Sequence, residues 1–248
     1  MESAVTAIIQ ARLGSTRLPA KVLAEIRGKP MLLHVLERVA DVRRIDNIVV
    51  ATTTLEADDL IVEKVQAWGY DVFRGSSEDV LSRYYGAAAK YSCSQIVRIT
   101  SDCPLVDPQI ADTVISEHLD GRYDYTSNTL QPRTFPRGLD VECFTFQALE
   151  LTANRAKEDY QREHVTAFMY ESCGLFQIHG VPAPQALTFP EMRICVDTAE
   201  DLEVVRAVFE AFPNAEKGPY AEKVVGFLLE HPEVMRINVT VRQKGLKE

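Results

Sequence analysis

Hydrophobic positions in the first 118 residues alternate between two kinds of pattern. Short apolar runs rich in β-branched residues predict strands that are buried on both faces, and apolar stripes at helical spacing predict helices between them. The predicted strands are residues 5–10, 47–52, 70–73 and 95–100. The predicted helices are one opened by Pro30 and those at residues 57–68, 78–91 and 108–118. This β-α-β-α order predicts an α/β fold with a mostly parallel sheet.

The pattern changes after residue 122, where turn formers and β formers become frequent. The expected elements there are a helix at 158–170, strands at 176–181 and 192–196, helices at 201–212 and 220–229, and a strand-like tail at 234–241. Residues 192–196 have the pattern of a strand that returns to the main sheet. We therefore expect one domain over residues 1–248, with an insertion at about 123–190 and a C-terminal extension at about 213–248.

Composition and charge narrow the class of protein. The chain of 248 residues is 46% hydrophobic and 25% charged, as in a typical soluble globular domain, and its net charge of −9 disfavours nucleic acid as a partner. It has no apolar run of about 20 residues, so no membrane span is expected. Five cysteines without a CxxC pair, and a first segment without signal-peptide features, predict a cytoplasmic protein with reduced thiols.

In a parallel sheet, ligands bind beyond the carboxyl ends of the strands, which places residues 11–21, 53–55 and 101–107 on the ligand side. The first of these loops lies in QARLGSTRLPAKV and carries Arg12, Arg17 and Lys21 around Gly14 and Ser15. It matches neither the P-loop nor the GxGxxG pattern. Cationic donors beside a flexible backbone predict a site for a small anion such as phosphate, and the alternative is a solvated basic face.

Two aspartates are candidates for chemistry at the same edge of the sheet. Asp102 follows the strand at 95–100 directly, and Asp197 follows the strand expected at 192–196. Asp107 is interpreted as a helix cap, and Thr198 with Asp201 as a capping box, which leaves Asp197 for the site. One or two carboxylates with substrate phosphates are a usual way to hold Mg²⁺. The pair opposite a cationic loop predicts metal-assisted transfer of a phosphoryl or nucleotidyl group.

Several segments together resemble a known family. They are IIQARLGSTRLPAKVL, RGSSEDVLSRYY, VRITSDCPLVDP, SNT…PRTFPRGLDVE, REHV and VDTAEDLE, between residue 5 and about residue 210. The chain resembles the spore coat polysaccharide biosynthesis protein F family, which is similar to the cytidylyltransferases that activate 3-deoxy-manno-octulosonate and acylneuraminate. This resemblance implies a three-layer Rossmann-like fold of the GT-A type. It also implies a homodimer formed through the inserted β-rich segment.

The implied reaction is transfer of CMP from CTP to a sugar or sugar-acid acceptor with Mg²⁺ and release of pyrophosphate, in the synthesis of surface polysaccharide or glycan precursors. By the same resemblance, the triphosphate would contact Ala11, Arg12, Ser15, Arg17 and Lys21, and the base and ribose would lie near Arg74, Gly75, Ser76 and Asp79. The metal ligands would be Asp102 and Asp197, which with Lys21 and Arg12 form the catalytic set. The acceptor site would include Asn128, Arg133, Asp140, Glu142, Glu163 and His164. Ala20 stands where the family often has Gly, and Arg137 stands where an acidic residue is common.

Two other functions are kept as alternatives. A GT-A glycosyltransferase that consumes a nucleotide sugar commonly carries a DxD pair, whereas this chain has Ser101-Asp102-Cys103. A nucleotide-binding protein without turnover would not need the set of Lys21, Asp102 and Asp197. Cys103 is interpreted as a small buried thiol rather than a nucleophile. Apolar side chains in the insertion, including those of Phe135, Leu139, Phe144 and Phe168, favour burial between two subunits.

Overall fold

The computed structural model describes residues 4–247 and is built around one seven-stranded sheet. The strand order is β5-β4-β1-β6-β8-β7-β9. The pairs from β5 to β6 and the β7–β9 pair are parallel, whereas β8 runs antiparallel to both of its neighbours. The strands are β1 (Val5–Gln10), β4 (Asn47–Thr53), β5 (Asp71–Gly75), β6 (Gln95–Thr100), β7 (Tyr125–Ser127), β8 (Glu142–Thr145) and β9 (Ile178–Gly180). The expected mostly parallel sheet is therefore confirmed.

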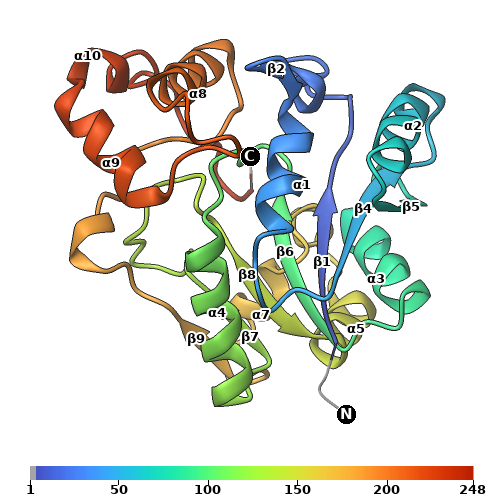
Figure 1. Cartoon of the computed structure of the whole chain (residues 1–248). Coiled ribbons are helices and arrows are strands. Elements are labelled where there is room, and N and C mark those ends of the chain that lie inside the picture. Colours follow the sequence, from blue (N-terminus) through green and yellow to red (C-terminus); the bar gives the residue numbers. More distant parts are fainter. Residues whose placement is uncertain (1–3, 248) are drawn as a thin grey trace.

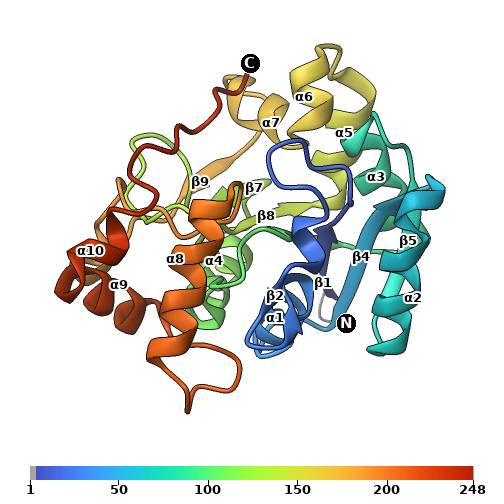
Figure 2. The same ribbon diagram turned by 90° about the horizontal axis from the view of Figure 1, so that it is seen from above.

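Helices cover both faces of this sheet, as Figures 1 and 2 show. Helices α1, α2 and α4 pack on one face, and α3, α5 and α7 on the other. Along β1, Ala7 and Ile9 face the first group while Ile8 faces the second, as the pleat of a strand requires. The helices are α1 (Met31–Val39), α2 (Asp59–Ala67), α3 (Val80–Lys90), α4 (Pro108–Gly121), α5 (Phe146–Arg155), α6 (Asp159–Glu163) and α7 (Ala167–Glu171). The three-layer arrangement expected from the sequence is present.

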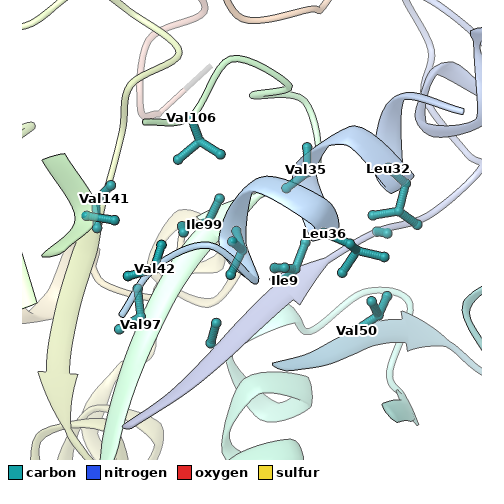
Figure 3. Close-up of a cluster of buried hydrophobic side chains, with 14 of the residues drawn as sticks. Ile9, Leu32, Val35, Leu36, Val42, Val50, Val97, Ile99, Val106 and Val141 are labelled. Atoms are coloured by element: carbon teal, nitrogen blue, oxygen red, sulfur yellow. The ribbon is translucent and has the colours of Figure 1, made fainter. Parts of the chain in front are cut away.

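The core under α1 illustrates why the N-terminal half folds this way. Leu32, Val35 and Leu36 form the apolar stripe of α1 and lie against Ile9 and Val50 of the sheet (Figure 3). All five side chains are fully buried. Each contributes on the order of 1.5–3 kcal/mol by leaving water, so the strand runs and the helix stripe stabilise the layers together.

The C-terminal third forms a cluster of its own beside the sheet. Helix α8 (Ala199–Ala211), helix α9 (Ala221–Glu230) and the short α10 (Pro232–Met235) bury apolar side chains against loop residues such as Leu105 and Leu139. The small ribbon of β2 (Glu25–Ile26) and β3 (Lys29–Pro30) contributes Ile26 to the same cluster. This packing holds the loop that precedes α8 close to the carboxyl end of β6.

Three expected elements are wrong or altered. Residues 192–196 form no strand of the sheet and make only an isolated bridge between Arg193 and Arg137. The expected tail strand at 234–241 is α10 followed by turns, because Pro232 occupies the first helical turn. The expected helix at 158–170 is divided into α6 and α7, since Val165 adopts a left-handed φ of 59°.

Residues 123–190 extend the sheet with β7, β8 and β9. Phe135 and Leu139 are buried in the cluster that α8 and α9 form, Phe144 is buried under α3 and α5, and Phe168 is partly buried beside Phe144's cluster. These side chains therefore do not require a second subunit to cover them, and the homodimer stays a prediction that rests on the family resemblance alone. Among the described residues, no helix has the length and apolarity needed to span a bilayer.

His118 of α4 supplies a test of the packing between α4 and the sheet. Its ring nitrogens contact Gln95 Oε1 at 2.9 Å and Thr126 Oγ1 at 3.0 Å. Burial lowers the pKa of His118 from 6.5 to about 4. The unfolded chain takes up a proton near the ordinary value and the folded chain only near pH 4, so stability falls as the pH decreases through this window. The expected loss is about 3 kcal/mol.

Urea denaturation between pH 7 and pH 4 measures this effect. The His118→Gln variant should lose less stability than the wild type over the same pH range, because Gln has no titrating proton. Parallel pH profiles for the two proteins would show that His118 is not held neutral by its burial.

Candidate active site

A cavity of about 450 Å³ opens at the carboxyl ends of β1 and β6, where the topology predicts a ligand. Its size is in the usual range for small-molecule sites. The loop after β1 forms one wall, and the loops after β6 and before α8 form another. Of the residues predicted for the site, the cavity is lined by Ala11, Arg12, Ser15, Arg17, Lys21, Asp102, Asp140, Glu163, His164 and Asp197.

The loop after β1 is held in shape by its own backbone and by one buried carboxylate. Leu13 N donates to Asp58 Oδ1 at 2.8 Å, and Ala20 N donates to Leu13 O at 3.0 Å. Asp58 in turn accepts from Thr53, at the end of β4, so the loop is tied to the neighbouring strand. Ala20 has a left-handed φ of 53°, a conformation that costs a residue with a β-carbon roughly 1 kcal/mol. This explains why glycine suits the position.

Lys21 joins the two aspartates predicted for the site. Its Nζ lies 3.0 Å from Asp102 Oδ2, 2.8 Å from Asp197 Oδ1 and 2.8 Å from the carbonyl oxygen of Val196. Burial disfavours the charged lysine, but the two carboxylates outweigh it and raise the pKa of Lys21. Three residues that are far apart in the sequence therefore meet at one point of the cavity.

Asp197 is the most strongly paired carboxylate of this group. Besides Lys21, it contacts Arg17 at 2.9 Å and Arg193 at 2.6 Å. Burial alone would raise the pKa of Asp197, but the surrounding cations lower it below its ordinary value. Asp197 follows no strand, contrary to expectation. The turn that begins α8 positions it, and there Thr198 and Asp201 form the predicted capping box.

The donor set around Lys21 fits a divalent cation. One carboxylate oxygen from each of Asp102 and Asp197 lies within 3.0 Å of the same ammonium nitrogen, so both oxygens face one point. Oxygen donors of this kind suit hard cations such as Mg²⁺. Among residues 4–247, no group of three or more acidic, histidine or cysteine side chains is placed to hold a metal. Phosphate oxygens would therefore have to complete the coordination.

Two arginines of the cavity, one buried and one half-buried, were not predicted. Arg83 of α3 is 2% exposed, its Nε has no hydrogen-bond partner among the described residues, and burial lowers its pKa. Arg98 of β6 pairs with the buried Glu142, which outweighs burial and raises its pKa. Both positions lie within ordinary amphipathic patterns, so no sequence signal distinguishes them from other surface arginines. They add positive charge to the base of the cavity.

The residues expected near the base and ribose do not line the cavity. Arg74 pairs with Asp59 at 2.6 Å and also donates to the carbonyl of Thr53. Asp79 caps α3 and pairs with Arg162 at 2.5 Å. Ser76 accepts backbone hydrogen bonds in the same turn, and a β-carbon at Gly75 would meet the side chain of Arg83. Their contact with a nucleotide stays a prediction.

The expected acceptor residues divide into two groups. Asp140, Glu163 and His164 line the cavity. Arg133 does not line it, but forms an ion pair with Asp140. The other two residues, Asn128 and Glu142, form hydrogen bonds within the fold and do not line the cavity. Asn128 bridges Leu139 O at 2.7 Å and Val141 N at 2.8 Å, and Glu142 accepts from Arg98, Tyr125 and Thr166.

Cys103 lines the cavity but is 3% exposed, and burial raises the pKa of its thiol well above the ordinary value. A thiol held neutral in this way is a poor nucleophile. This agrees with its interpretation as a small buried side chain.

A mostly parallel sheet covered on both faces, with a cationic cavity at the carboxyl ends of β1 and β6, defines this chain as an α/β protein of the nucleotidyltransferase fold. More specifically, it belongs to the cytidylyltransferase family, since the family model described as "Cytidylyltransferase" matches residues 6–229.

Individual relatives agree with this assignment. The spore coat polysaccharide biosynthesis protein SpsF of Bacillus subtilis is 35% identical over 208 residues, which cover 82% of this chain and 85% of that protein. The structure of a cytidylyltransferase from Leptospira borgpetersenii has a TM-score of 0.89 at 32% identity, covering 98% of this chain and 100% of that one. The structure of CMP:2-keto-3-deoxy-manno-octonic acid synthetase with CTP has a TM-score of 0.65 at 22% identity, covering 84% of this chain and 99% of that one. This last likeness concerns the fold.

Proposed function

We propose that the protein transfers CMP from CTP to an oxygen atom of a sugar or sugar-acid acceptor and releases pyrophosphate. The observation that carries the proposal is the meeting of Lys21, Asp102 and Asp197 in a cationic cavity of a cytidylyltransferase-family chain. The choice of acceptor is supported by the names of the relatives, among them a polysaccharide biosynthesis protein and a 3-deoxy-manno-octulosonate cytidylyltransferase that is 39% identical over 114 residues.

In the proposed reaction, the acceptor oxygen attacks the α-phosphorus of CTP. The new oxygen–phosphorus bond forms as the bond from the α-phosphorus to the bridging oxygen breaks, and the electron pair leaves with pyrophosphate. Arg12 and Arg17, which line the cavity, would bind phosphate oxygens and hold the leaving group in line. Arg83 would add positive charge that no protein carboxylate neutralises by an ion pair among the described residues. Catalysis would thus be mostly positioning and electrostatic stabilisation.

Mg²⁺ is the cofactor we propose, with Asp102 and Asp197 as its protein ligands. Bound there, Mg²⁺ would offset the charge that develops on the phosphates. The pairing of Lys21 with both carboxylates keeps one oxygen of each facing the same point. Asp140, Glu163 and His164 lie on the remaining wall, where the acceptor would enter.

A coupled assay of pyrophosphate release tests the function. The protein is incubated with Mg²⁺, a panel of sugar acids and sugars, and in turn CTP, UTP, ATP or GTP. We expect release that requires an acceptor and is fastest with CTP, and we expect EDTA to abolish it. Equal turnover with a purine nucleotide would contradict the cytidylyltransferase assignment, because the pocket would then not select the base.

A further inference from the structure

The C-terminal segment of residues 239–247, called here the C-terminal strap, lies over the cavity although it is distant from every predicted site residue in the sequence. Figure 2 shows it leaving α10 and crossing toward α6 and α7. Gln243, Lys244 and Gly245 are among the residues that line the cavity. The match to the family model ends at residue 229, so the strap lies beyond the part of the chain that defines the family.

One end of the strap is tied to the wall that carries Asp197. Arg193, which is 7% exposed, donates from Nη1 to Gln243 Oε1 at 2.6 Å and from Nη2 to Asp197 Oδ2 at 2.6 Å. Just before the strap, the buried Asn238 donates to the carbonyl of Arg193 at 3.1 Å and to Asp201 at 2.9 Å. A single guanidinium therefore joins the strap to a carboxylate of the proposed metal site.

The other end is tied to the wall that carries the proposed acceptor residues. The ring of His164 lies close to the backbone of Leu246. The ammonium of Lys247 lies 4.8 Å from the centre of the Tyr160 ring, within reach of a cation–π contact. The strap thus spans the cavity from the Asp197 wall to α6, and Lys244 lies between the two anchor points.

The charge balance of the cavity favours an anionic ligand beside Lys244. Seven cations line the cavity, namely Arg12, Arg17, Lys21, Arg83, Arg98, Arg137 and Lys244, against four carboxylates, namely Asp102, Asp140, Glu163 and Asp197. Lys244 forms no ion pair with any carboxylate among residues 4–247. The cavity keeps its 450 Å³ with the strap in place, so the strap forms a wall of the site and does not fill it.

We propose that Lys244 is an additional phosphate-binding residue of the enzyme, carried to the nucleotide by the C-terminal strap. This proposal rests on the proposed function, because it takes the nucleotide phosphates as the anion. The strap would close the site over the phosphates, and its link through Gln243 and Arg193 would hold Lys244 at a fixed place relative to Asp197.

The test compares Lys244→Gln with Lys223→Gln, which removes the same charge from an exposed position of α9 outside the cavity. Two quantities are measured for each full-length variant: kcat/KM for CTP, and the Kd for inorganic pyrophosphate by calorimetry. We expect Lys244→Gln to lower kcat/KM and to weaken pyrophosphate binding, each by about tenfold, as for loss of one charge-assisted hydrogen bond. Lys223→Gln should stay within about twofold of wild type. Lys244→Arg should keep most of the catalytic efficiency and most of the affinity for pyrophosphate.

Lys244 is exposed, so its replacement should leave the thermal midpoint unchanged. The inference is overturned if Lys244→Gln matches the Lys223→Gln control in both measurements, or if kcat/KM falls while pyrophosphate binding does not. A wild type that binds pyrophosphate through Lys244 yet never turns over CTP would instead contradict the proposed function and leave the phosphate site standing.

Discussion

Replacing Asp102 with Asn should lower kcat by about a thousandfold or more, because the substitution keeps the shape of the side chain and removes the charge that the proposed metal requires. Among residues 4–247, Lys21 is the only cation paired with Asp102, so few other contacts change. The Asp197→Asn variant should lose activity to a similar extent. Its carboxylate also pairs with Arg17 and Arg193, and we expect it to lose stability as well.

Asp120→Asn is the matched control for these variants. Asp120 lies exposed near the end of α4 and accepts only from Ser116 among the described residues, so the same chemical change there should leave kcat unaltered. Steady-state rates at saturating CTP and Mg²⁺ measure turnover, and the thermal midpoint of each variant measures stability. Together they distinguish a catalytic defect from a folding defect. Near wild-type rates in both Asp102→Asn and Asp197→Asn would show that the metal assignment is wrong.

Lys21→Ala should weaken nucleotide use far more than Lys29→Ala, although both remove one positive charge from the same basic stretch. Lys21 lies in the cavity, bound to Asp102 and Asp197. Loss of an ammonium from a partly desolvated phosphate site should cost about 2–5 kcal/mol, much of it in the transition state as charge builds on pyrophosphate. Without Lys21, the two carboxylates would also repel each other.

Lys29 is suited to be the control because it lies in β3, outside the cavity, and pairs with Glu37 at 3.0 Å. This ion pair is partly exposed to solvent. Such a pair contributes roughly 0–1 kcal/mol. The measurement is the ratio of kcat/KM for the two variants at fixed Mg²⁺ and ionic strength. Comparable losses would mean that the basic stretch acts through its overall electrostatic field. Residues 11–21 would then not form a specific phosphate-binding loop.

The sequence predicts the N-terminal half of the fold well because each apolar run there is buried on both faces. It is less informative at residues 192–196, where Met192, Ile194 and Val196 are buried under α8 and α9 without pairing in the sheet. An alternating apolar pattern reports burial and does not report which backbone groups pair. Helix α5 was not predicted because its apolar stripe is short, although Thr145 caps it by accepting a hydrogen bond from Ala148 N.

The rule that ligands bind at the carboxyl ends of strands predicts that Lys21 and Asp102 lie at the same edge of the sheet, and the structure shows the two side chains in contact there. Asp197 was found by its place after an apolar run, although that run is not a strand. Arg83 and Lys244 could not be found in this way, because one lies within a helix stripe and the other in a tail that returns to the cavity only in three dimensions. Contacts of that kind depend on the packing of α8 and α9, which local sequence patterns do not encode.

The most direct test of the proposed function follows the α-phosphorus of CTP. The protein is incubated with CTP labelled at the α-phosphorus, Mg²⁺ and the acceptor panel, and the label and the released pyrophosphate are both quantified. We predict that the label enters a CMP–acceptor conjugate in a one-to-one ratio with pyrophosphate. Recovery of the label only in free CTP or in free CMP, with every acceptor tested, would contradict the account.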